Sequence, residues 1–95
     1  MKNYDESIKA CNEAIALKPT AARAYAQLAS AYIKKGDPDK GITNAQKALE
    51  IEPKFTRAKN ILKWAVKEKA KATGQTPEAV AESLGLKLKF NNDKK

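Results

Sequence analysis

The residues best suited to chemistry in this sequence are basic, amide and hydroxyl side chains spaced at helical intervals in two stretches. In residues 21–35 the set is Arg23, Gln27, Ser30 and Lys34, and in residues 55–72 it is Arg57, Asn60, Trp64 and Lys67. Spacings of three and four residues place each set on one face of a helix. Guanidinium and ammonium groups bind carboxylates, amides add hydrogen bonds, and a tryptophan supplies an apolar anchor. The two sets together predict a concave basic surface that binds an acidic segment.

A second basic pattern runs along residues 55–72 and supports an alternative function. Its members follow one another at intervals of four residues: Lys59, Lys63, Lys67 and Lys71. Such a stripe attracts phosphates, as in nucleic acid or an anionic membrane. A lysine stripe is more often the solvated side of a helix, and proteins that stack nucleic-acid bases usually interleave aromatic residues with the charges. One tryptophan is weak support for that alternative.

The sequence offers little material for catalysis, for a metal or for a cofactor. It has no histidine and one cysteine, Cys11, so neither a typical zinc site nor the commonest general base is present. Two close carboxylate pairs, Asp37 with Asp39 and Glu50 with Glu52, lie where helix ends are expected and serve there as caps or solvated groups. We expect no enzyme activity, no metal and no cofactor. Cys11 is interpreted as a small core residue, because no base or helix N-terminus would activate its thiol.

Length and charge indicate one small, basic, helix-rich domain. The chain has 95 residues and a formal charge of +8, and 32% of its residues are charged. Most of the excess lies in residues 54–72, where seven Lys or Arg face one acidic residue. No apolar run approaches the roughly 20 residues of a membrane span, and the first residues do not form a signal peptide. A cytoplasmic location is therefore expected.

The elements that position these side chains repeat with a period of 34 residues. Identical residues separated by 34 positions include Asp5 and Asp39, Ile8 and Ile42, Ala14 and Ala48, Pro19 and Pro53, Arg23 and Arg57, Leu28 and Leu62. Apolar residues within each unit follow helical spacing, and caps or breakers such as Gly36, Asp37 and Pro53 separate the segments. The pattern predicts helices over residues 4–17, 21–35, 38–51, 55–72 and 77–84, stacked as antiparallel pairs.

Residues 22–55, "ARAYAQLASAYIKKGDPDKGITNAQKALEIEPKF", resemble one complete tetratricopeptide repeat (TPR). The residues that match the signature are Tyr25, Leu28, Ala29 and Tyr32 in the first helix, and Gly41, Ala45, Ala48 and Pro53 in the second. Residues 4–21 resemble the second helix of a preceding repeat, with Ser7 where Ala is usual. The resemblance implies an all-α, TPR-like solenoid of about one and a half repeats. Two departures, Pro38 in place of an aromatic residue and Gly41 in place of Ala, are expected to be sterically permissive.

The last predicted long helix departs from the repeat in a way that predicts the end of the stack. It carries Lys59 and Lys63 where the full repeat has Tyr25 and Ala29, and ammonium groups are not buried there without partners. We therefore expect residues 55–72 to be a capping helix that completes a repeat domain over residues 1–72. Residues 73–95 would add the short helix over 77–84 and a basic, apolar tail, "LKLKF", over 86–90. Val80, Leu84 or this tail would provide an alternative role for Trp64, as a residue that they cover.

The first predicted helix has a face without an expected partner, formed by Ser7, Cys11 and Ala14. Two explanations are open: the chain is the C-terminal part of a longer repeat array, or a second copy covers the face as a homodimer. The resemblance implies a non-catalytic protein-interaction module whose concave surface holds a peptide or helix of a partner, here an acidic one. Some members clamp a terminal carboxylate, but Ala26, Gln27, Ser30 and Ile61 stand where that clamp needs Lys, Asn, Asn and Arg, so no clamp is expected.

Overall fold

The computed structural model describes residues 3–86, which form five α-helices without strands in that part of the chain. The helices are α1 (Tyr4–Leu17), α2 (Ala22–Lys35), α3 (Pro38–Ile51), α4 (Thr56–Thr73) and α5 (Pro77–Ser83). The all-α prediction is confirmed. Helices α1 and α3 have the predicted bounds, and the bounds of the other three differ by one residue at one or both ends.

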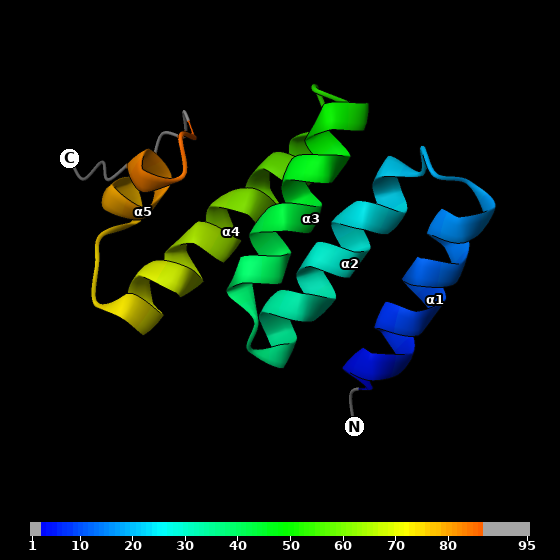
Figure 1. Ribbon diagram of the computed structural model, residues 1–95, viewed down its shortest axis with the longest axis horizontal. Helices are drawn as coiled ribbons and strands as arrows, with labels where there is room; N and C mark the ends of the chain where they lie inside the picture. Colours follow the sequence, from blue (N-terminus) through cyan, green and yellow to red (C-terminus); the bar gives the residue numbers. More distant parts are fainter. Residues whose placement is uncertain (1–2, 87–95) are drawn as a thin grey trace.

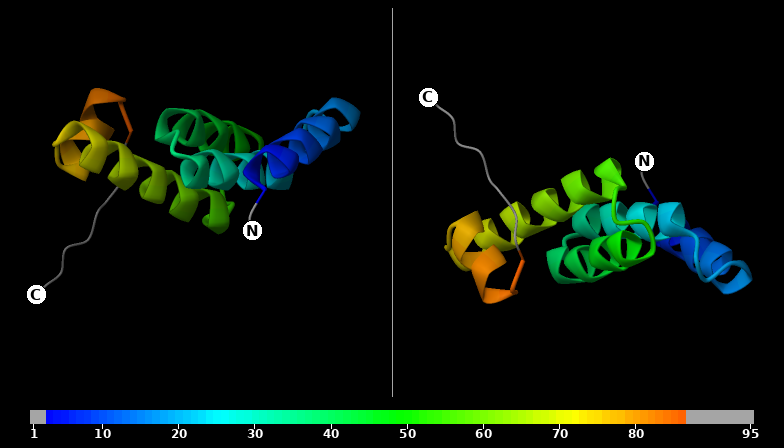
Figure 2. Two further views of the ribbon diagram at one scale, coloured as in Figure 1. Left: turned by 90° about the horizontal axis from the view of Figure 1, so that it is seen from below. Right: turned by 90° about the horizontal axis from the view of Figure 1, so that it is seen from above.

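The four long helices stand side by side and alternate in direction, so neighbours along the chain are antiparallel (Figure 1). Helix α2 packs against α1 and α3, and α4 packs against both α3 and α2. Seen edge-on, α2 and α4 flank α3 on one side, and the short α5 folds back beside the far end of α4 (Figure 2). This arrangement is the expected solenoid of antiparallel helix pairs.

Equivalent residues 34 positions apart begin the second helix of each pair. The side chain of Asn3 accepts a hydrogen bond from the backbone N–H of Glu6 at 3.1 Å, and Asp37 accepts one from Lys40 at 3.3 Å. Both side chains are N-caps, satisfying a backbone donor that the helix leaves free. The period of the sequence is therefore a period of local structure.

The first helices of the two pairs differ in length because their C-terminal signals differ. Helix α2 ends at Gly36, whose φ of 100° is a left-handed conformation that glycine adopts without strain. The equivalent position on α4 is Ala70, so the helix continues until Gly74, where φ is 73°. Helix α4 therefore has 18 residues against 14 in α2, and its last turn provides the surface on which α5 packs.

An ion pair also recurs with the repeat. Lys35 of α2 bonds Asp5 of α1 at 2.5 Å, and Lys69 of α4 bonds Asp39 of α3. Both pairs join the end of one helix to the start of its neighbour. They are solvent-exposed, so they contribute more to alignment than to stability.

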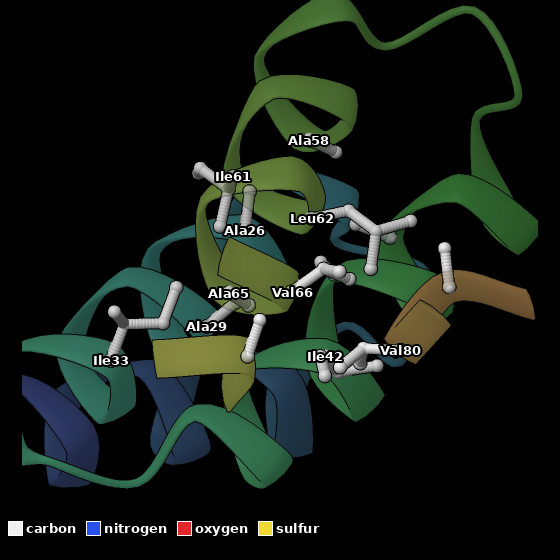
Figure 3. Packing of buried hydrophobic residues seen from close by; sticks show 14 of the residues in the cluster. Ala26, Ala29, Ile33, Ile42, Ala58, Ile61, Leu62, Ala65, Val66 and Val80 are labelled. Carbon is white, nitrogen blue, oxygen red and sulfur yellow. The ribbon is translucent and has the colours of Figure 1, made fainter. Parts of the chain in front are cut away.

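The core depends on small residues where helices approach most closely. The fully buried alanines are Ala29 on α2, Ala45 and Ala48 on α3, and Ala58 and Ala65 on α4, each 0% exposed. Larger side chains, including Ile42, Leu62, Val66 and Val80, fill the spaces between them (Figure 3). A second, smaller cluster joins α1 to α2 through Ile8, Cys11, Leu28 and Ala31.

Gly41 is required by its surroundings, so the expectation that it is a permissive substitute for Ala was wrong. A Cβ atom at this position would lie 2.5 Å from Cγ1 of Ile33 and 3.2 Å from the carbonyl oxygen of Ala29. Contacts this short force a neighbour to move. Sequence comparison alone does not reveal the conflict, because it depends on the side chain of Ile33 on the facing helix.

Ala48→Leu should lower the free energy of unfolding by about 1–3 kcal/mol, because the larger side chain cannot fit between α3 and α2. Ala14→Leu is the matched control, since Ala14 is the equivalent residue 34 positions earlier but is exposed on α1. It should change stability by less than about 0.5 kcal/mol. Urea unfolding followed by circular dichroism measures both, and equal losses of stability would contradict the packing described.

Gly41→Ala should destabilise the fold by about 1 kcal/mol, although alanine is the better helix former. The overpacking cost of roughly 1–3 kcal/mol exceeds the gain in helix propensity of about 1 kcal/mol. In an Ile33→Ala background the obstructing atom is gone, so the same change should be neutral or stabilising. A double-mutant cycle by urea unfolding tests this, and a coupling energy near zero would refute the contact.

Candidate functional site

A groove of about 580 Å³ lies between α1 and α2 and is the candidate site. Its walls come from two antiparallel helices, with one contribution from the first turn of α4. The lining residues are Asn3, Tyr4, Ser7, Ala10, Cys11, Ala14, Ala24, Gln27, Ser30, Ala31, Lys34 and Arg57. The groove therefore joins the face of α1 that lacked an expected partner to the predicted binding face of α2.

Helical periodicity explains why these side chains meet. On α1, Ser7, Cys11 and Ala14 follow at intervals of four and three residues, which places them on one face. On α2, Gln27 and Lys34 are seven residues apart and share a face by the same rule. The small cluster of Ile8, Cys11, Leu28 and Ala31 holds the two helices together beneath the groove.

The charge on the groove has one sign. Lys34 and Arg57 are cations, and no aspartate or glutamate is among the lining residues. Asn3 and Gln27 add amides, while Ser7 and Ser30 add hydroxyls. A cationic groove with these donors is suited to carboxylates on a partner.

Cys11 forms part of the groove floor and does not have the character of a nucleophile. It is 7% exposed, and its sulfur lies 4.0 Å from Oε1 of Gln27. Burial raises the pKa of the Cys11 thiol above its ordinary value, so the thiol stays protonated at neutral pH. Its burial and its contacts with Ile8, Leu28 and Ala31 are those of the small core residue that was predicted.

The structure brings only half of the predicted partner-binding set into the groove. Gln27, Ser30, Lys34 and Arg57 line it, whereas Arg23, Asn60, Trp64 and Lys67 are not among its lining residues. Arg23, Asn60 and Lys67 are exposed elsewhere on α2 and α4. As a binding site the full set of eight stays a prediction.

Trp64 is not a free anchor in this groove. It is half-buried and packs against the main core cluster, which also contains Val80 of α5 and is contacted by Leu86. Leu84, the other residue expected to cover it, is 42% exposed. The rest of the "LKLKF" tail lies outside the described residues.

Sequence reasoning missed several residues of the α1 wall as site residues. Asn3, Tyr4 and Ala10 line the groove but were not predicted to do so, and Ser7, Cys11 and Ala14 were named only as a face without a partner. The signal was available in that face: a helix side of small residues with nothing to cover it is a groove wall.

The lysine stripe lies on α4. Lys59, Lys67 and Lys71 are exposed and Lys63 is half-buried. The Nζ atom of Lys71 lies 3.8 Å from a carboxylate oxygen of Glu68. Lys59 is not sealed beneath another helix, as the predicted capping role of α4 requires. The division of the chain after residue 72 stays a prediction, because Val80 and Ala81 of α5 belong to the same core cluster as α4.

Within residues 3–86 there is no group of three or more His, Cys, Asp or Glu side chains that could hold a metal ion. In the same part of the chain, none of the helices combines the length and the apolar character needed to cross a membrane.

Comparisons with known proteins place the chain among repeat proteins. Over 94 residues, 96% of the chain, it is 37% identical to the Hsp70-Hsp90 organizing protein of Triticum aestivum, and it covers 15% of that protein. It is also 35% identical over 74 residues to Hsp70-Hsp90 organizing protein 3 of Arabidopsis thaliana, with 75% of the chain and 13% of the relative covered. The anaphase-promoting complex subunit cut9 of Schizosaccharomyces pombe is 31% identical over 74 residues, which cover 78% of the chain and 11% of the relative.

The chain thus spans only a small part of the length of these relatives. No solved structure matches it. A sequence profile described as "Tetratricopeptide repeat" matches residues 1–20 and 22–55, the same two stretches in which the period of 34 residues was recognised. With its caps, small-residue contacts and helix pairs recurring at that period, the chain belongs to the tetratricopeptide repeat family and forms a protein–protein interaction module.

Proposed function

We propose that this module is non-catalytic and binds an acidic segment of a partner protein in the groove between α1 and α2. The observation that carries the proposal is the charge of the groove: Lys34 and Arg57 line it, and no carboxylate does. Gln27 and Ser30 would hydrogen-bond the bound segment. The family membership supports binding of a protein, and the charge supports its acidic character.

The printed names of two relatives make the chaperones Hsp70 and Hsp90 candidate partners. We propose that recognition here depends on side-chain carboxylates rather than on a clamped C-terminal carboxylate. Of the positions where a clamp would need charged or amide side chains, Ala26 and Ile61 are buried in the main core. Neither could reach a ligand even if its side chain were polar.

The lysine stripe remains the alternative site. Its exposed members could bind phosphates of nucleic acid or of an anionic membrane. It is open and faces solvent, and no lysine of the stripe lines the groove except through the neighbourhood of Arg57 on the same helix. The groove is preferred because it combines cations, hydrogen-bonding groups and a concave shape.

Arg57→Glu should weaken binding of an acidic partner segment at least about tenfold. Losing one charge-assisted hydrogen bond of about 1.5 kcal/mol accounts for that factor, and the introduced repulsion adds to it. Fluorescence anisotropy with a labelled peptide of alternating glutamate and alanine measures the effect.

Lys59→Glu is the matched control for this experiment. It makes the same change of net charge on the same helix, two residues away, at a position outside the groove. Binding should change by less than about threefold, as general screening of surface charge predicts. Equal weakening by the two variants would show that only overall charge matters, and stronger weakening by Lys59→Glu would favour the stripe.

A further inference from the structure

The groove has an internal counterpart that is already filled. The α1 wall is formed by Ser7, Cys11 and Ala14, and the residues 34 positions later are Gly41, Ala45 and Ala48 on α3. Helix α2 lies directly on that face of α3: Ile33 and Ala29 approach Gly41, and Ala45 and Ala48 are 0% exposed. On α1, by contrast, Ser7 and Ala14 are exposed.

The other wall of the groove corresponds in the same way. It is formed on α2 by Ala24, Gln27 and Ala31, whose equivalents on α4 are Ala58, Ile61 and Ala65. All three α4 residues are buried in the cluster to which α2 contributes a ridge, Ala22, Ala26, Ala29 and Ile33. The groove between α1 and α2 therefore has the two walls between which, one repeat later, a helix fits.

A helix with this ridge fits for a geometric reason. The ridge residues follow at intervals of four, three and four, and three of the four are alanines, so the backbones approach closely. An extended peptide places alternate side chains on opposite faces and presents no such ridge. The geometry of the walls favours a helix over a strand.

The open groove differs from its filled counterpart mainly in polarity. Gln27 stands where the filled groove has Ile61, Lys34 where it has Glu68, and Ser7 where it has Gly41. Arg57 adds a second cation. A complementary helix must therefore carry carboxylates beside its small-residue ridge, whereas α2 itself is basic, with Arg23, Lys34 and Lys35.

We infer that the groove between α1 and α2 is the binding site of one acidic α-helix from a partner, seated where α2 sits on α3 and α4, with an alanine-rich ridge against Ser7, Cys11 and Ala14. The inference rests on the proposed function and adds the conformation and the contact pattern of the bound segment. A second copy is disfavoured as the occupant, because it would bring a chain of charge +8 to a cationic groove.

The test uses three synthetic peptides with the sequence of residues 21–36. All carry Arg23→Glu, Lys34→Glu and Lys35→Glu, which make the peptide acidic without changing its ridge. The first is held helical by a staple on the face opposite the ridge. The second adds Ala29→Leu to the stapled peptide and so obstructs close approach, and the third replaces the staple by Ala29→Pro, which prevents the helix.

Binding of each peptide to the whole chain is measured by isothermal titration calorimetry. The stapled ridge peptide should bind at least about tenfold more tightly than either of the others, a difference of about 1.4 kcal/mol. The chain variant Ala14→Leu should reduce its affinity by a similar factor, because the leucine fills the α1 wall. Ala16→Leu, the same change at an exposed position of α1 outside the groove, should leave the affinity within about twofold.

Each contrary result has one meaning. If the proline peptide binds as tightly as the stapled one and Arg57→Glu weakens both, the bound segment is not a helix; this inference fails and the proposed function stands. If Arg57→Glu weakens no acidic peptide, the proposed function itself fails. If sedimentation shows a dimer of the chain alone that Ala14→Leu abolishes, a second copy occupies the groove and the inference is overturned.

Discussion

Close approach of helices through residues without large side chains is the constraint on which the fold depends. Helix α2 can lie against α3 because Gly41 offers only a hydrogen atom beneath Ile33 and Ala29. Ala45, Ala48, Ala58 and Ala65 extend the same contact over two helices. A domain of 95 residues has little core to spare, so contacts of this kind, repeated at a fixed period, provide much of its packing.

The fold could be predicted almost fully from the sequence, since the signals are local. Asp37 as cap, Gly36 as stop and the helical spacing of Leu28, Ala31 and Tyr32 each act within a few residues, and the period of 34 then fixes how the pairs stack. The error at Gly41 is different in kind. Its cause is a side chain on another helix, in a rotamer that no local pattern specifies.

The candidate site could be predicted only in part for a related reason. Helical spacing showed which residues of α2 share a face, and Gln27 and Lys34 do line the groove. It could not show how far along α4 the groove extends, because that depends on where α4 starts relative to α2. Arg57, in the first turn of α4, reaches the groove, whereas Trp64, two turns later, packs on the core near α5. The same physical account covers the filled and the open groove, which differ in polarity rather than in shape.

The most direct test of this account is a map of the residues that an acidic helix contacts in solution. In a titration of isotope-labelled chain with a stapled acidic helix, followed by backbone amide NMR shifts, the largest changes should fall on Ser7, Cys11, Gln27 and Lys34. Those residues form the two walls of the groove together with Ala14 and Arg57. Changes concentrated instead on Lys59, Lys67 and Lys71, with the α1 wall unaffected, would contradict the account.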